Sequence, residues 1–191
     1  MPATPRRTRS DAVQNRARLL EVAAQVFAEQ GLDTAPAAIA KQAGVGVGTL
    51  YRHFPTRETL VDAAYRHQLT LVCGKAPDLL TRHPAAEATQ VWMEHFLDYA
   101  TTKSGMSAAL NAVIASGVDP YADSRALLTD AVATLLKAGA RDGSLRTDVT
   151  SDDVLLLLGG VACSAQHSTR EQARRLIALL MDALTAHSPA D

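Results

Sequence analysis

The sequence predicts an all-α fold of about nine helices, in which a three-helix helix-turn-helix domain precedes a larger helical domain. Aromatic residues make up only 4% of the chain, whereas Ala and Leu are abundant. This bias favours helices that pack closely through small side chains. Apolar residues recur at helical spacing in one segment after another, and no run alternates β-branched with polar residues. We therefore expect no strand.

The first thirty residues predict a basic arm followed by a helix. Residues 1–10 are polar and contain two prolines and three arginines, so we expect a mobile arm. A helix is predicted over 11–30, where Leu20 and Phe27 lie on one apolar face. Gly31 is suited to the left-handed position after the end of this helix.

Two short helices joined by a tight turn are predicted next, over 36–43 and 47–53. The first begins with a proline, which fits the first helical turn, and Thr34 in the preceding Asp-Thr pair offers it an N-cap. Gly44 between the helices must take a backbone angle that a side chain would oppose. Pro55 ends the second helix, because the residue before a proline is pushed away from helical angles. Short helices joined in this way form a helix-turn-helix, and the domain is predicted to span 11–56.

A longer helix is predicted from Arg57 into the seventies, with Thr56 as its cap and the domain boundary inside it. Gly, Pro, Asp and Ser residues delimit the later segments. Five further helices are predicted at 84–101, 104–116, 122–140, 151–166 and 170–186.

The charge distribution favours one face turned towards a polyanion. Residues 1–66 carry nine Lys or Arg and six Asp or Glu, whereas residues 67–191 carry ten and fourteen. The net charge of −1 for the whole chain therefore combines a basic first third with an acidic remainder. A solvated basic tail would give the same asymmetry, so charge alone leaves the alternatives open.

The outward face of the second short helix is suited to the major groove of DNA. Arg52 and His53 can donate to guanine acceptors, and Thr49 can meet a phosphate or a thymine methyl group. Tyr51, at the flank, has a hydroxyl that can bond phosphate, and Arg57 adds a phosphate contact from the next helix.

The segment IAKQAGVGVGTLYRHFPTRETL resembles the TetR family of bacterial regulators. The shared pattern is Ile-Ala, then Gly-Val four residues on, Gly-Thr-Leu-Tyr, an aromatic-Pro pair and a basic-Glu pair. The match spans 14–66, and the rest of the chain matches only in being helical. The resemblance implies a cytoplasmic homodimer that binds operator DNA through 47–53, with a ligand-binding and dimerisation domain over 57–191.

The resemblance also assigns candidate DNA contacts. One departure from the family is that Gly46 and Val47 stand where members often have Ser and Lys or Arg. Base readout then rests on Arg52, on Thr49 and on an apolar contact from Val47. The arm arginines can reach the adjacent minor groove. The complete set of candidates is Arg6, Arg7, Arg9, Thr34, Gly46, Val47, Gly48, Thr49, Tyr51, Arg52, His53 and Arg57.

The resemblance implies a repressor that a small-molecule effector releases from a near-palindromic operator. One alternative is a ligand-independent helix-turn-helix activator or DNA-compacting protein, and another is an all-helical carrier or enzyme. The sequence contains no GxSxG, HExxH or P-loop motif, and no two histidines are spaced i,i+4. We therefore expect no catalytic residue, metal or cofactor.

The larger domain offers two sets of candidates. Several aromatic and polar residues can line an apolar pocket for the effector, although core packing is the simpler explanation of the aromatic ones. The pocket candidates are Trp92, His95, Phe96, Tyr99, Met106, Tyr121 and Arg125. Apolar stripes on the last two helices can close a core or pair with a second copy, and the resemblance favours pairing. The interface candidates are Leu155, Leu158, Val161, Ala162, Ala165, Leu176, Ile177, Leu180, Met181 and Leu184.

The two cysteines and the apolar runs complete the expectations. Cys73 and Cys163 form no CxxC pair, so we expect reduced thiols and leave a redox role open. The longest apolar run, 154–162, is too short to span a bilayer, and no apolar stretch follows the first arginines. No membrane partner is therefore expected.

Overall fold

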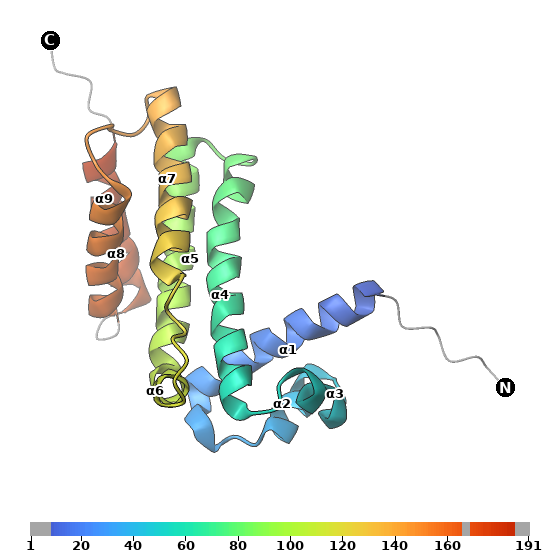
Figure 1. Cartoon of the computed structure of the whole chain (residues 1–191). Coiled ribbons are helices and arrows are strands. Elements are labelled where there is room, and N and C mark those ends of the chain that lie inside the picture. Colours follow the sequence, from blue (N-terminus) through green and yellow to red (C-terminus); the bar gives the residue numbers. More distant parts are fainter. Residues whose placement is uncertain (1–8, 166–168, 186–191) are drawn as a thin grey trace, which may run out of the picture. The chain divides into compact units, whose positions relative to one another are not determined.

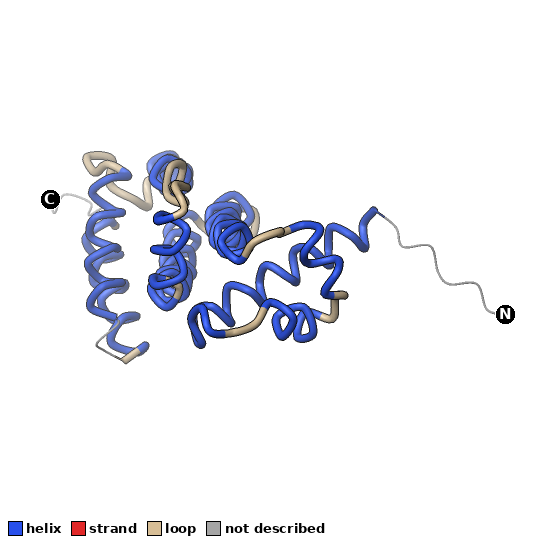
Figure 2. The backbone as a smooth tube through the Cα atoms, turned by 60° about the horizontal axis from the view of Figure 1, so that its bottom comes forward, coloured by secondary structure: helices blue, strands red, loops and turns tan. Residues whose placement is uncertain are grey.

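The computed structural model describes residues 9–165 and 169–185, with side chains from Val13 onward. The described residues form helices and loops, without a named strand (Figures 1 and 2). This confirms the all-α prediction. The elements are α1 (Arg9–Gln30), η1 (Gly31–Asp33), α2 (Pro36–Ala43), α3 (Val47–His53), α4 (Arg57–Leu80), α5 (Ala85–Gly105), α6 (Ser107–Ala115), α7 (Ser124–Asp142), α8 (Ser151–Ala165) and α9 (Arg170–Leu184).

Most helix boundaries lie within a few residues of those predicted, but α1 already begins at Arg9, inside the predicted arm, and α5 runs to Gly105. Helices α2 and α3 begin and end at the predicted residues, and Gly31 takes a left-handed φ of 64° after α1. The predicted cap of α2 is wrong. Its N-cap is Ala35, which has no side chain able to accept a hydrogen bond, and the Thr34 hydroxyl instead donates to Oε1 of Gln30. That hydroxyl lies one residue too early to reach the free amides of α2.

The described chain divides into two compact units. The N-terminal unit combines residues up to Gln68 with Thr102–Pro120, and the C-terminal unit combines Leu69–Thr101 with residues from Tyr121 onward. Helix α4 contributes residues to both units. Helix α6 lies in the N-terminal unit, whereas the sequence placed it in the domain over 57–191.

A close contact between α5 and α1 organises the N-terminal unit. A Cβ placed on Gly105 would lie 2.6 Å from the backbone oxygen of Ala28 and 2.9 Å from its Cα. These distances are shorter than any ordinary van der Waals contact, and the obstacle is backbone. Only glycine therefore fits where the end of α5 meets α1.

We expect Gly105→Ala to lower the free energy of unfolding by about 1–3 kcal/mol, because backbone must shift to admit the methyl group. Urea titration followed by circular dichroism measures this loss. The matched control is Gly74→Ala in α4, where a Cβ would meet nothing within 4 Å. That substitution should be neutral or stabilise by up to about 1 kcal/mol. Equal effects of the two substitutions would contradict the close contact.

The core of the C-terminal unit is built around Trp92. Its side chain is fully buried, and its Nε1–H donates to the backbone oxygen of Val72 over 2.9 Å. The ring lies 5.8 Å from that of Phe96, centroid to centroid. The indole thus fills apolar space and satisfies its only polar group, as a buried Trp requires.

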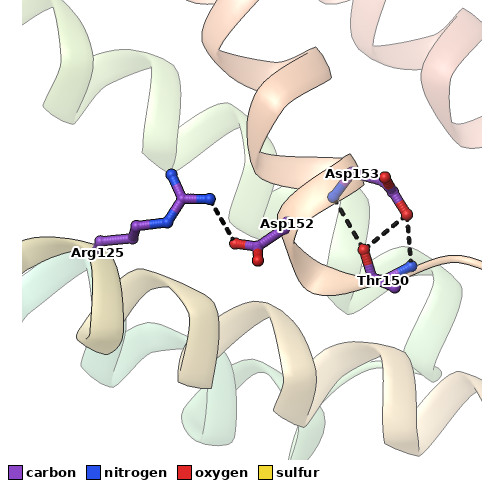
Figure 3. A network of polar contacts seen from close by, with 4 residues as sticks. All are labelled: Arg125, Thr150, Asp152 and Asp153. Carbon is purple, nitrogen blue, oxygen red and sulfur yellow. Dashed lines mark hydrogen bonds and ion pairs between the residues drawn. The ribbon is translucent and has the colours of Figure 1, made fainter.

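The start of α8 is fixed by a reciprocal cap and an ion pair. Thr150 donates from its backbone N–H and its hydroxyl to Oδ2 of Asp153, whose backbone N–H donates back to the hydroxyl (Figure 3). These hydrogen bonds hold the pKa of Asp153 below its usual value. Arg125 of α7 donates to Oδ1 of Asp152 over 2.8 Å and joins the first turns of α7 and α8 (Figure 3).

None of the described helices is both long and apolar enough to cross a membrane.

Cys73 is expected to react slowly with thiol reagents in the folded protein. Burial, followed by the nearby carboxylate of Asp130, raises its pKa to about 11. At pH 8 about one thiol in a thousand is then the reactive thiolate. A chromogenic aromatic disulfide should modify exposed Cys163 first and Cys73 only after denaturation. Cys163→Ser should remove the fast phase and Cys73→Ser should keep it, whereas a fast phase that survives Cys163→Ser would refute this assignment.

Candidate nucleic-acid interface

The turn between α2 and α3 is closed by backbone hydrogen bonds around Gly44. This glycine has a φ of 70°, and its N–H donates to the carbonyl of Lys41. The N–H of Val45 donates to the carbonyl of Ala40 over 2.9 Å. A side chain at Gly44 would oppose this left-handed backbone, so the residue sets the angle at which α3 leaves α2.

The two helices bury different amounts of their surface. Helix α2 buries Ile39, Ala40 and Ala43, whereas α3 buries only Leu50. Phe54 follows α3, is buried, and donates its backbone N–H to the carbonyl of Leu50. One side chain and the residue after the helix therefore attach α3 to the unit, and the remainder of the helix is available for contacts.

The outward face of α3 is accessible. Val47 is 41% exposed and Tyr51 is 47% exposed, so both side chains present apolar surface to solvent. Arg52 donates from Nε to the carbonyl of Gly48, one turn earlier, over 3.2 Å. The exposed candidates of this face are Gly46, Val47, Gly48, Tyr51, Arg52 and His53, and Thr49 is half-buried.

One predicted phosphate contact, Arg57, is engaged inside the unit. The half-buried guanidinium of Arg57 donates to the carbonyl of Leu32 and, over 3.4 Å, to that of Thr34. Arg57 thus ties the start of α4 to the segment before α2. Of the predicted arm, Arg6 and Arg7 lie outside the described residues, as does the side chain of Arg9.

The cations of the two units differ in their partners. In the N-terminal unit, Arg16, Arg18 and Lys41 are exposed and make no ion pair with any side chain that the structure describes. In the C-terminal unit five arginines pair with carboxylates, whereas Arg82 and Arg141 make no ion pair with a described side chain. These ion pairs join Arg125 to Asp152, Arg146 to Asp148, Arg170 to Asp98, Arg174 to Glu94 and Arg175 to Glu171. The N-terminal unit, which carries α3, thus holds exposed cations that no described carboxylate neutralises, as binding to a polyanion requires.

Most of the predicted pocket residues are buried in the core or held in an ion pair. Trp92, Phe96 and Tyr99 are buried core residues of the C-terminal unit, and Met106 is buried in the N-terminal unit. Tyr121 and His95 are half-buried, and Arg125 forms the exposed ion pair with Asp152. Burial, followed by the nearby charge of Lys75, lowers the pKa of His95.

A cavity of about 270 Å³ lies elsewhere in the C-terminal unit, between α5, the end of α8 and the start of α9. None of the seven predicted pocket residues lines it. Its rim holds two ion pairs, in which Arg170 lies 2.9 Å from Asp98 and Arg174 lies 3.5 Å from Glu94. The remaining lining residues are Leu97, Thr101, Ala165 and Ala173. Sequence patterns did not predict this cavity, because α5 is distant along the chain from α8 and α9, which form its other walls.

The predicted interface residues occupy buried and half-buried positions in the single chain. Half of the candidates are buried within the chain itself, namely Leu158, Ile177, Leu180, Met181 and Leu184. The other half are half-buried, namely Leu155, Val161, Ala162, Ala165 and Leu176. The exposed apolar residues of α8 and α9 are instead Leu156, Leu157 and Leu179, with 79%, 55% and 63% of their surface accessible. These residues lie outside the predicted stripes, because the run of leucines in α8 presents an apolar residue on every face.

Two family models match the chain. Residues 19–64 match the bacterial regulatory proteins of the tetR family, and residues 84–186 match the C-terminal domain of SbtR-like transcriptional regulators. The second match alone covers more than half of the chain.

Solved structures resemble the chain along nearly its whole length. A TetR transcriptional regulator from Streptomyces coelicolor is 46% identical, with a TM-score of 0.87, over 91% of this chain and 99% of the other. A TetR transcription regulatory protein from Mycobacterium vanbaalenii is 32% identical, with a TM-score of 0.75, over 93% and 98%.

Curated relatives match over shorter stretches. An HTH-type transcriptional regulator from Staphylococcus aureus strain USA300 is 32% identical over 93 residues, which are 48% of this chain and 50% of that protein. Another from the bovine strain RF122 is 45% identical over 53 residues, 29% of its length. The chain thus spans half or less of these curated relatives. These matches and the exposed α3 lead to one conclusion: the chain belongs to the TetR family of bacterial transcriptional regulators, which is a family of regulators and not of enzymes.

Proposed function

We propose that the protein is a dimeric repressor that binds a near-palindromic operator through α3 and is released by a small-molecule effector. The observation that carries the proposal is the exposed face of α3, where Val47, Tyr51, Arg52 and His53 are accessible on a helix that buries only Leu50. A helix of this kind can enter the major groove without disturbing the core beneath it.

Dimerisation is supported by the exposed leucines of α8 and α9. Leu156, Leu157 and Leu179 present apolar surface that a monomer would leave in water. Gly159 and Gly160 are exposed on the same helix as the first two leucines, and a Cβ on either would meet nothing within 4 Å. Small residues of this kind let a partner helix approach closely. A two-fold pairing of such helices would present two recognition helices about 34 Å apart, one turn of the duplex.

The cavity between α5, α8 and α9 supports a place for the effector. Its apolar wall includes Leu97 and Ala173, and charged groups stand at its rim. That combination is typical of sites that bind small organic molecules. To release DNA 100-fold, an effector needs to prefer the non-binding form by about 2.7 kcal/mol.

The test is a gel-shift titration on the promoter region beside the protein's own gene, with random-sequence duplex as competitor. We expect a saturable shift that resists the competitor, and footprinting should show a near-palindromic site. Candidate effectors are then added at saturating DNA. An effector that binds the protein, seen as a saturable rise in melting temperature, but leaves DNA affinity unchanged would refute the release mechanism.

Arg52→Ala is expected to lower operator affinity by about 10-fold to 100-fold, because a base contact is worth about 1–3 kcal/mol. Affinity for random-sequence duplex should fall much less. The measurement is a fluorescence anisotropy titration of both duplexes. Arg141→Ala, an exposed arginine at the end of α7 in the other unit, is the charge-matched control and should change neither affinity. Equal losses on both duplexes would show that Arg52 contacts only the backbone.

A further inference from the structure

Arg16 on α1 makes an unusual contact with the residue that follows the recognition helix. Its guanidinium carbon lies 5.6 Å from the centroid of the Phe54 ring. Phe54 is only 4% exposed, whereas Arg16 is exposed. The Phe54 ring in turn lies 6.2 Å from that of His53 at the end of α3. The positive charge of Arg16 is therefore held beside the exposed end of α3, although it comes from a different helix.

An aromatic ring holds an arginine without neutralising it. The face of the ring attracts the guanidinium through its quadrupole, but the net charge and the N–H donors remain. A carboxylate partner would cancel the charge, and Arg16 has none among the side chains that the structure describes. The ring also restricts the rotamers of a long side chain, so less conformational entropy is lost when the guanidinium binds an anion.

We propose that Arg16 is a DNA-backbone contact of this protein, held ready for a phosphate by the ring of Phe54. Helix α1 then forms part of the nucleic-acid interface and is more than the support on which α2 and α3 rest. The proposal rests on DNA binding by α3 and adds a residue that the sequence pattern did not single out. The partner chemistry is the phosphodiester oxygen, which an arginine can bind through two parallel N–H donors.

A purely structural role makes different predictions. If Arg16 only covered Phe54, its removal would lower the melting temperature and leave the salt dependence of DNA binding unchanged. A phosphate contact has the opposite signature, because each neutralised phosphate releases counterions and contributes about one unit to the slope of log affinity against log salt.

The experiment measures the affinity of the full-length protein for the promoter fragment and for random-sequence duplex at several salt concentrations. We expect Arg16→Ala to weaken binding about tenfold at low salt on both duplexes and to reduce the slope by about one. Arg16→Lys should restore the slope but only part of the affinity, since the ammonium lacks the planar fit to the ring and to phosphate. Arg141→Ala, with the same change in net charge, should keep the slope of the wild type.

A double-mutant cycle tests the role of the ring. Phe54→Leu keeps an apolar side chain but removes the aromatic face, and its folding is checked by melting temperature. Arg16→Ala should cost about threefold less in affinity on this background than in the wild type, because the preorganising contact is already absent. Equal costs on the two backgrounds, or an unchanged slope for Arg16→Ala, would overturn the proposal. If the wild type itself bound neither duplex, the proposed function would fail, and that outcome is distinct from failure of Arg16 alone.

Discussion

Leu156→Arg is expected to convert the proposed dimer into a monomer and to lower operator affinity by at least about 100-fold. Leu156 is 79% exposed in the single chain and lies on the apolar surface of α8 that we assign to the dimer interface. A two-fold interface would contain the new charge twice. Desolvating an unpaired arginine costs several kcal/mol, and the buried surface of two leucines is lost as well. Because both half-sites must be filled together, a monomer also loses the gain from simultaneous binding.

Sedimentation velocity measures the change in mass, and gel shifts measure the change in operator affinity. Leu127→Arg is the matched control, since Leu127 is a leucine of α7 that is 41% exposed. This control should remain dimeric and bind DNA normally. A Leu156→Arg protein that sediments as a dimer would place the interface on another surface.

Trp92→Ala is expected to lower the free energy of unfolding by about 3–5 kcal/mol. The indole is fully buried, and its removal leaves a large cavity beside Phe96. It also removes the N–H that donates to the carbonyl of Val72. Since small proteins are stable by only about 5–15 kcal/mol, the variant should unfold at a much lower urea concentration.

Circular dichroism is the suitable probe, because Trp92 is the only tryptophan and the variant loses its fluorescence signal. Trp92→Phe separates the two contributions, since it fills most of the space but lacks the donor, and it should cost about 1–2 kcal/mol. If alanine were tolerated with a loss below that of phenylalanine, Trp92 would belong to a binding pocket and not to a packed core.

Local signals were sufficient to predict where most of the helices lie, although α5 ends at Gly105 and not at the predicted residue 101. Pro36 at a first turn, Gly44 at a left-handed position and Pro55 after α3 act within a few residues of where they stand. Thr34 shows the limit of this reasoning. Threonine is a residue type suited to N-caps, but Thr34 lies one residue before the N-cap position of α2. Only the backbone geometry shows which amide its hydroxyl can reach.

The arrangement of the C-terminal unit could not be predicted in the same way. Periodicity identifies residues that share one face of a helix. Because α8 is apolar on every face, periodicity does not show which of its faces packs against the rest of the chain. Leu158 is buried, whereas Leu156, two residues earlier and on the opposite side of the helix, is exposed. The cavity at Arg170 and Asp98 depends on an ion pair between residues that are 72 positions apart. Likewise, Arg57 matches the family pattern, but its engagement by two backbone carbonyls appears only in three dimensions.

The sparse attachment of α3 has a consequence for how the protein can change over evolutionary time. Leu50 is the only buried residue of the helix. Substitutions at Val47, Arg52 or His53 therefore remove few contacts that stabilise the fold. Surface changes of this kind usually alter stability by less than about 0.5 kcal/mol. A duplicated copy of the protein can therefore acquire a new target sequence by a few point mutations, without passing through unfolded intermediates.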